Sequence, residues 1–167
     1  FADAAAFGEV VFNCVQGIHA LEALEAAGKG NLAGKVLVDQ SNPYHYENGH
    51  ISLDPAYSGS TCLGEKVQEL LPETKVVKTL NFIGAMMMTD PGCIAEAPTG
   101  FYCGNDAGAK ETVRQILEDF GWQDTFDMGD ISMSRYTEML GAFWVPVLGQ
   151  LGTMQWGFRL VREPRGE

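Results

Sequence analysis

Three short runs of consecutive apolar residues constrain this chain most, because segments of helical character separate them. The runs lie at 9–15 (EVVFNCV), 35–39 (KVLVD) and 75–80 (KVVKTL). A strand that is apolar at successive positions, rather than at every second one, is typical of a parallel sheet that helices cover on both faces. The sequence therefore predicts an α/β fold built around a parallel sheet.

The segment between the first two strands has the spacing of an amphipathic helix. Over residues 18–27, Ile18, Leu21, Leu24 and Ala27 fall on one helical face. Gly28 follows at once and is a typical helix terminator. We therefore expect a helix over 18–27 with these four side chains facing the core.

The other helices and strands are predicted from helix caps, helix terminators and the spacing of apolar residues. Residues 41–58 are rich in Tyr, His, Asn, Gly and Pro and predict a long irregular loop. Asp106 and Gly121 bound the clearest helix, and Ser60 is the expected cap of another. The full set of expected helices is 2–7, 18–27, 60–71, 106–120 and most of 131–162, with two further strands at 100–103 and 124–128.

Composition narrows the class of partner. The formal net charge is -11, which disfavours nucleic acid because phosphate binding needs clustered Lys and Arg. No apolar run approaches the roughly 20 residues that a membrane helix needs, so no membrane partner is expected. The four cysteines are scattered without a C-x-x-C pair, which favours reduced thiols and a cytoplasmic protein.

Polar side chains follow each of the three apolar strands. The strands end in Asn13-Cys14-Val15-Gln16-Gly17, in Asp39-Gln40-Ser41-Asn42-Pro43 and in Lys78-Thr79-Leu80-Asn81-Phe82. In open α/β sheets, ligands bind beyond the carboxyl ends of the strands, and amide side chains both donate and accept hydrogen bonds. Asn-Pro pairs are also ordinary turn residues. Because three strands end in this way, a binding site for a carboxamide or ribose group is as plausible as three ordinary turns.

Other motifs point to no further chemistry. The glycine-rich segment 28–34 follows a helix and precedes a strand, which is the reverse of a phosphate-binding loop. His45 and His50 lack additional ligands at metal-site spacing, so no metal is expected. No candidate nucleophile has a general-base residue at the sequence spacing of a known catalytic motif. This pattern suits hydride transfer, which depends on orientation and exclusion of water more than on a protein acid or base.

Several strings in this order resemble the coenzyme F420-dependent NADP oxidoreductases. The strongest pieces are Asn31–Asp39 (NLAGKVLVD) leading to Ser41-Asn42-Pro43, and Val76–Asn81 (VVKTLN). They are followed by Tyr102–Ala107 (YCGNDA) and by Phe120-Gly121-Trp122. The resemblance runs over nearly the whole chain.

The resemblance implies an oxidoreductase that transfers a hydride between NADP(H) and a second acceptor such as coenzyme F420 or a flavin. It implies a Rossmann-like NADP-binding domain at 1–130 and a C-terminal helical region packed on it at 131–167. A homodimer is expected on separate grounds, because the C-terminal helices are apolar and would leave a surface to cover. Carried over to this sequence, the cofactor-binding residues are Val15, Gln16 and Gly17 at the first strand end, Asn42 and Pro43 at the second, and Asn81 and Phe82 at the third.

Two departures from the family pattern leave alternatives open. A proline that is usual near Gln16 is replaced, and the glycine-rich fingerprint of the first strand is missing, so about two βα units would precede Phe1. The chain is therefore expected to carry the nicotinamide side of the site. The alternative is a non-catalytic binding or oligomerisation module that cannot hold a dinucleotide by itself.

Overall fold

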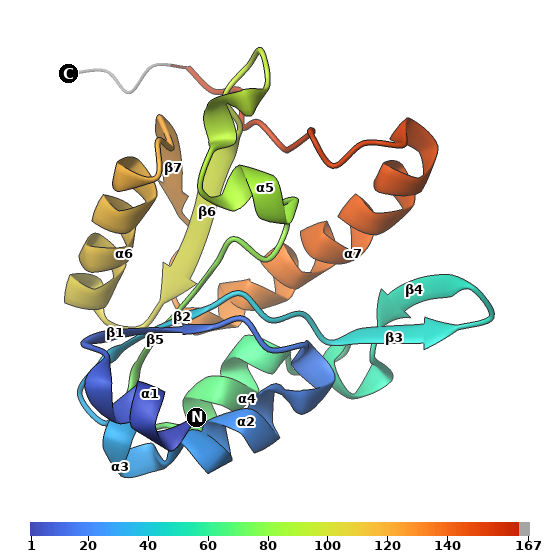
Figure 1. The fold of residues 1–167 in the computed structure, drawn as a ribbon. Coiled ribbons are helices and arrows are strands. Elements are labelled where there is room, and N and C mark those ends of the chain that lie inside the picture. The colour runs from blue at the N-terminus through green and yellow to red at the C-terminus, as the bar shows by residue number, and fades with distance from the viewer. Residues whose placement is uncertain (164–167) are drawn as a thin grey trace.

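The computed structural model describes residues 1–163. A five-stranded sheet with the order β1-β2-β5-β6-β7 forms its centre (Figure 1). β1, β2 and β5 run parallel, β6 is antiparallel to β5, and β7 is parallel to β6. The predicted α/β, Rossmann-like class is confirmed, with a sheet that is mixed rather than wholly parallel. The strands are β1 Val10–Asn13, β2 Val36–Asp39, β5 Lys75–Thr79, β6 Thr99–Gly104 and β7 Asp124–Asp127.

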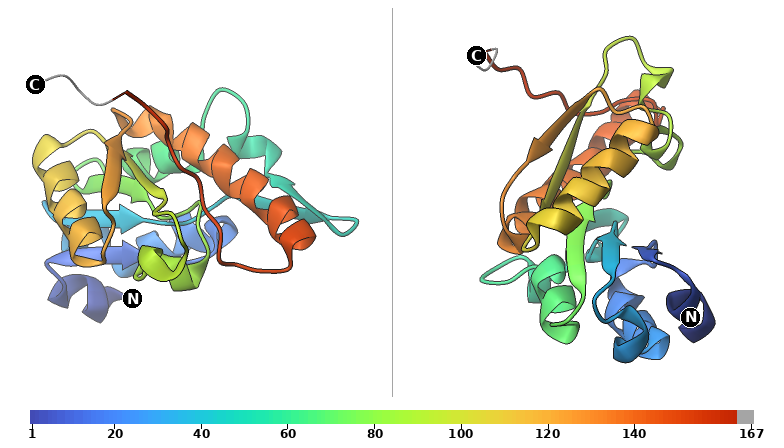
Figure 2. Two further views of the ribbon diagram at one scale, coloured as in Figure 1. Left: turned by 90° about the horizontal axis from the view of Figure 1, so that it is seen from above. Right: turned by 90° about the vertical axis from the view of Figure 1, so that its left-hand side faces the viewer.

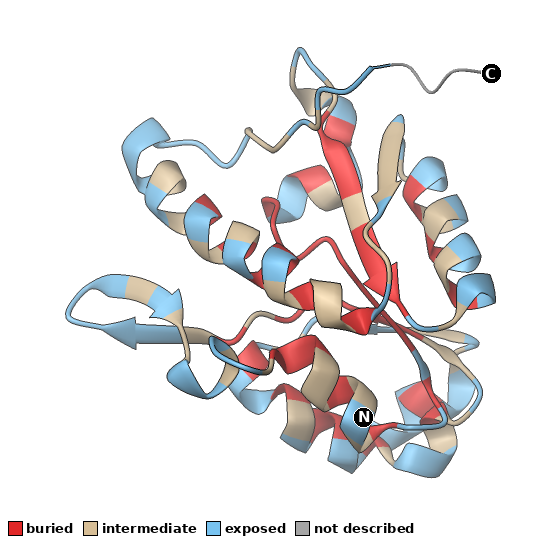
Figure 3. Cartoon of the chain, turned by 180° about the vertical axis from the view of Figure 1, so that it is seen from behind, coloured by how far each residue is buried: buried red, intermediate tan, exposed pale blue. Residues whose placement is uncertain are grey.

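Helices cover both faces of the sheet, and the two cores explain the continuous apolar runs. Leu37 and Val76 point into one core, and their neighbours Val38 and Val77 point into the other. All four are buried. Figure 3 shows buried residues gathered in the sheet and on the inner sides of the helices, with exposed residues on their outer sides. The first core lies under α1 (Ala2–Phe7), α2 (Ala20–Ala27), α3 (Lys29–Leu32) and α4 (Leu63–Leu70), and the second under α5 (Ala85–Met88) and α6 (Ala107–Asp119).

The longest helix, α7 (Ser134–Leu151), packs against α4 and β4 and reaches the sheet at β5 and β6. Figure 2 shows it running past the sheet, with the C-terminal segment returning along its side. Pro146 lies inside α7, and the helix continues past it to Leu151. No helix among residues 1–163 combines the length and the apolar character that crossing a membrane requires.

The sequence predicts a long irregular loop over residues 41–58. The structure instead has a β-hairpin within this segment. β3 (Tyr44–Glu47) pairs antiparallel with β4 (His50–Leu53). Asn48 and Gly49 form the two-residue turn with φ values of 51° and 79°. Two positive φ values in succession favour Asn-Gly and match the twist of a hairpin. The turn pair was visible in the sequence, but the strands are too short and polar to stand out.

Three local expectations were also wrong. Cys62, not Ser60, caps α4, because Glu65 accepts from the Cys62 backbone N–H in a capping box. Ile18 is 52% exposed, because residues 17–19 form a 3-10 turn before α2 begins at Ala20. The C-terminal helix ends at Leu151, and residues 152–163 are not helical.

Gly152 explains that helix end, because its φ of 67° gives the left-handed conformation that terminates α7. The chain then returns to the sheet, where the Thr99 backbone N–H donates to the Phe158 carbonyl over 2.8 Å. Other predicted ends are confirmed. The Asp106 carboxylate accepts from the Ala109 N–H at the start of α6, and Gly121 follows the helix with a φ of 95°.

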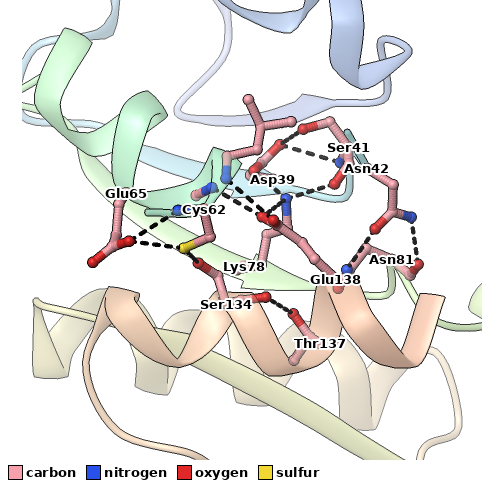
Figure 4. A network of polar contacts seen from close by, with 12 residues as sticks. Asp39, Ser41, Asn42, Cys62, Glu65, Lys78, Asn81, Ser134, Thr137 and Glu138 are labelled. Carbon is pink, nitrogen blue, oxygen red and sulfur yellow. Dashed lines mark hydrogen bonds and ion pairs between the residues drawn. The ribbon is translucent and has the colours of Figure 1, made fainter. Parts of the chain in front are cut away.

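A buried charge network joins the middle of the sheet to α7. The side chains of Lys78 on β5, Asp39 on β2 and Glu138 on α7 are fully buried (Figure 4). Lys78 Nζ lies 2.8 Å from Asp39 Oδ2 and 3.3 Å from Glu138 Oε1. Burial by itself lowers the pKa of the Lys78 ammonium, but the two carboxylates outweigh it and raise the pKa to about 12. Lys78 is therefore charged at neutral pH.

Hydrogen bonds from the chain replace the water that the two carboxylates lose. Asp39 Oδ1 accepts from Asn13 Nδ2 at 2.9 Å and from the Ser41 hydroxyl at 2.7 Å. Glu138 accepts from the Leu63 and Gly64 backbone N–H groups at the first turn of α4. These N–H groups have no partner within their own helix, and a negative charge is favourable there. The network thus binds β1, β2, β5, α4 and α7 together.

We expect Lys78→Met to destabilise the protein strongly, because it leaves two buried carboxylates without their cation. Breaking a buried ion pair from one side costs about 3–5 kcal/mol. Lys75→Met is the matched control on the same strand, since Lys75 is 44% exposed and its ion pair with Asp106 spans 3.8 Å. Such surface pairs contribute about 0–1 kcal/mol. Urea unfolding of the two variants measures the difference, and equal losses of unfolding free energy would contradict the role of Lys78.

Candidate functional site

The polar ends of β1, β2 and β5 lie at one edge of the sheet. These strands are parallel neighbours, so their carboxyl ends coincide. The register places Asn13 beside Asp39, and Asp39 beside Lys78. The three polar residues that close the apolar runs therefore meet in one row, and the chain that follows them forms the surface where ligands of open α/β sheets bind.

Two asparagines bridge the second and third strand ends. Asn42 Nδ2 donates to the Asn81 carbonyl at 2.6 Å, and Asn81 Nδ2 donates to Asn42 Oδ1 at 2.9 Å (Figure 4). Lys78 Nζ also donates to the Ser41 carbonyl at 2.5 Å, directly before Asn42. The ion network therefore fixes the loop that carries Asn42.

The Asn81 side chain has an oxygen without a partner. Asn81 is 4% exposed, and its Oδ1 makes no hydrogen bond among the described residues. Buried polar atoms are nearly always paired, so an orphan acceptor needs an explanation such as a missing ligand. Leu80, the preceding residue, has a φ of 61°, which is costly for a side chain of this kind. Unfavourable backbone next to an unsatisfied amide is typical of a functional position.

Two glycines let the backbone approach this pair closely. A Cβ on Gly17 would lie 2.0 Å from the Asn42 carbonyl oxygen. A Cβ on Gly141 of α7 would lie 2.7 Å from both the Asn81 carbonyl oxygen and the Tyr44 hydroxyl, and 3.0 Å from Asn42 Oδ1. Any side chain at either position would displace the pair. Gly17 brings the end of β1 to the site, and Gly141 brings α7 to it.

A cavity of about 270 Å³ adjoins the asparagine pair. Its polar end is formed by Gln40, Asn42, Tyr44 and Asn81, and its walls are apolar. Burial raises the pKa of the Tyr44 phenol to about 12, although the Lys78 charge opposes the shift. Tyr44 therefore keeps its proton at neutral pH. The apolar walls are Phe82, Ile83, Gly84, Ala85, Met88, Trp144, Val145 and Met154.

The structure brings together five of the seven cofactor-binding residues expected from the resemblance. Gly17, Asn42, Pro43 and Asn81 touch or lie beside one another, and Phe82 is fully buried in the adjoining wall. The other two lie apart from this cluster. Val15 lines a second apolar cavity between β1 and the helices α1 and α2, and Gln16 is exposed.

Sequence reasoning missed the residues that hold the site in place. Glu138 and Gly141 lie in a helix whose sequence indicates only packing, and nothing local marks them as partners of residues sixty or more positions away. Tyr44 carried a usable signal, because it directly follows Asn42-Pro43. Trp144, in the same helix, forms one wall of the cavity, and its place in an apolar helix gives no local sign of that role. Residues 1–163 contain no cluster of three or more His, Cys, Asp or Glu side chains that fits a metal ion.

No family model matches the chain. Among curated proteins, metalloreductase STEAP3 of Rattus norvegicus is 32% identical over 126 residues, which is 72% of this chain. The chain spans only 24% of STEAP3, about a quarter of its length.

Two of the solved structures that are similar in fold illustrate the range of identity. One is hypothetical protein SMa0349 of Sinorhizobium meliloti, with 25% identity, a TM-score of 0.64 and coverage of 78% of this chain and 61% of that one. The other is a candidate F420-dependent NADP reductase of Arthrobacter sp. FB24, with 44% identity and a TM-score of 0.92. That match covers 96% of this chain and 73% of the Arthrobacter chain. The chain therefore belongs to the F420-dependent NADP reductase family.

Proposed function

We propose that this chain forms the nicotinamide side of an NADP(H) site in an oxidoreductase that passes a hydride to a second acceptor. The observation that carries the proposal is the Asn42–Asn81 pair, with its buried unpartnered oxygen, at the carboxyl ends of three parallel strands. Membership of an NADP reductase family supports the same reading.

The residues present fit a nicotinamide. Its carboxamide carries N–H donors and a carbonyl acceptor, the groups that asparagine side chains match. No donor within residues 1–163 reaches Asn81 Oδ1, so a carboxamide N–H would satisfy it. Gly17 lets the end of β1 pack directly on the backbone of Asn42 and Pro43, because a Cβ there would lie 2.0 Å from the Asn42 carbonyl oxygen. When bound, NADPH supplies two electrons and one proton as a hydride.

The chain itself contributes orientation and a dry environment. Asn42 is held on one side by Asn81 and on the other by the loop that Lys78 anchors through the Ser41 carbonyl. Holding two reactants in a fixed, well-aligned orientation lowers the activation free energy by an amount on the order of 7–11 kcal/mol. The walls of the 270 Å³ cavity are mostly apolar, so a ring bound against them would displace water from the reacting face. Both contributions suit hydride transfer.

The acceptor is part of the proposal, and coenzyme F420 is the first candidate because the Arthrobacter protein is named for it. A flavin is the second, since it also takes a hydride on a flat ring.

All four cysteines are free thiols, which supports a reducing compartment such as the cytoplasm.

A homodimer is the proposed assembly. Tyr136, Met139 and Phe143 form a stripe along α7 and are 49%, 46% and 58% exposed. Spacings of three and four residues place them on one face, and exposed apolar faces of this kind are typical of interfaces.

We expect Met139→Lys to lower the dimer fraction, because it puts a charge in the middle of this apolar face. Sedimentation velocity measures it, and a wild-type protein that is monomeric at all concentrations would refute the dimer.

We expect Asn42→Ala to weaken NADPH binding by about three- to tenfold, which corresponds to the loss of one neutral hydrogen bond. The rate of hydride transfer to coenzyme F420 should fall as well, because the ring loses its orientation. NADPH fluorescence measures affinity, and loss of NADPH absorbance under anaerobic conditions measures transfer.

Asn31→Ala is the matched control. Asn31 also loses one amide hydrogen bond, from its Nδ2 to the Ala27 carbonyl at 2.8 Å, but it lies on α3, away from the strand ends. Its NADPH affinity should equal that of the wild type. A wild-type chain that binds no NADPH refutes the proposed function, and equal affinities in wild type and Asn42→Ala refute the site.

A further inference from the structure

We infer that Met154 controls the access of the hydride acceptor to the nicotinamide, because its side chain closes the apolar end of the cavity beside the asparagine pair. An acceptor of three fused rings enters only when the segment that carries Met154 moves aside. The inference deepens the proposed function and rests on it for the identity of the two rings. The movement of the segment belongs to this chain alone and is tested without NADP(H).

The apolar part of the cavity extends along α7, away from the asparagine pair. Gly141 packs on that pair, whereas Trp144 and Val145 line the cavity one turn further along the helix. Met154 lies at the Trp144 end, because a Cβ on Gly84 would be 3.1 Å from Met154 Cβ and 3.2 Å from Trp144 Cζ2. A nicotinamide at the asparagine pair therefore lies at one end of the cavity, and Met154 lies at the other.

The cavity is too small for both reacting rings at once. Its volume is about 270 Å³, whereas cavities that hold drug-sized ligands measure roughly 300–1,000 Å³. A nicotinamide together with the three fused rings of a flavin or a deazaflavin is of drug size. Hydride transfer requires the reacting atoms to be about 3–3.5 Å apart, so the acceptor ring needs space inside the cavity. One wall has to move to provide that space.

The wall formed by residues 153–155, the Met154 segment, is the least tied down. The three residues are exposed. Within residues 1–163, the only hydrogen bond of the segment is internal and runs from the Gln155 N–H to Thr153 Oγ1 at 3.2 Å. Segments that are exposed and lack bonds to their surroundings open at a low cost in free energy. The other apolar walls lie on α5, on α7 or in the turn between β5 and α5.

Anchors on both sides of the Met154 segment keep its movement local. Gly152 precedes the segment with a φ of 67°, and a glycine changes its backbone angles without steric cost. Trp156 follows it and stacks on Trp144 at 5.6 Å with an interplanar angle of 5°. The Phe158 carbonyl then accepts from the first backbone N–H of β6. The segment can therefore swing while α7 and the sheet stay in place, as loops that gate active sites do.

Amide hydrogen exchange of the unliganded chain, read by mass spectrometry with fragmentation, tests whether the segment moves. The Met154 and Gln155 amides should exchange almost as fast as in an unfolded peptide. The Leu160 amide, which donates to Thr99 Oγ1 at 2.9 Å, should exchange at least about tenfold more slowly. Equal protection of Met154 and Leu160 would overturn the inference, because Met154 would then be as firmly held as the part of the chain that is bonded to the sheet.

Binding to the NADP⁺-saturated chain tests the control of access, because no hydride can pass in that complex. Oxidised coenzyme F420 and flavin mononucleotide are the probes, and quenching of their own fluorescence is the readout. Met154→Ala should lower the Kd of a probe about three- to tenfold, because the ring no longer has to displace the side chain. Met86→Ala is the matched control, since Met86 lies on α5, is 65% exposed and does not line the cavity.

The Kd of NADPH should be the same in wild type, Met154→Ala and Met86→Ala, since Met154 lies away from the asparagine pair. The inference is overturned if Met154→Ala binds the probes no more tightly than wild type, or if neither probe binds any of the three proteins while NADPH does. A chain that binds no NADPH refutes the proposed function instead, and the exchange experiment then still decides whether the Met154 segment moves.

Discussion

The structure depends on one buried cation. Lys78 lies in the middle strand of the sheet with no exposed surface, and it is held between Asp39 of β2 and Glu138 of α7. Burying these charges is costly, and only the surrounding hydrogen bonds make the arrangement tenable. Because the same ammonium also holds the Ser41 carbonyl, the interaction that joins α7 to the sheet is the one that places Asn42. Stability and the geometry of the site are therefore coupled.

This coupling explains why the site is compact. The parallel strands deliver their polar ends to one edge, and α7 closes over that edge through Gly141. The asparagine pair then sits between the sheet and the helix, with an apolar cavity beside it. A glycine on each side is the simplest means of bringing two backbones this close. Tyr44, the ionisable group at this end of the cavity, keeps its proton at neutral pH, so the arrangement orients a ligand rather than exchanging protons with it.

The sequence predicted the features that depend on local pattern. Continuous apolar runs identified strands buried on both faces, and Asp106 and Gly121 marked the ends of α6. Features that depend on distant contacts could not be predicted. Glu138 is an unremarkable acidic residue of an apolar helix until the fold brings it to Lys78, and the reversal of β6 relative to β5 leaves no local trace. The polar strand ends were visible, but their mutual hydrogen bonds were not.

The most direct test of the central claim is an NMR titration of the uniformly ¹⁵N-labelled chain with nicotinamide mononucleotide, observing asparagine side-chain amides. The account predicts that the Nδ2 signals of Asn42 and Asn81 move together and saturate, because the ligand meets their shared hydrogen-bonded pair. The Asn31 signal should stay in place, and adenosine monophosphate should move none of the three. Unmoved Asn42 and Asn81 signals, or equal movement with adenosine monophosphate, would contradict the claim that this pair receives the nicotinamide.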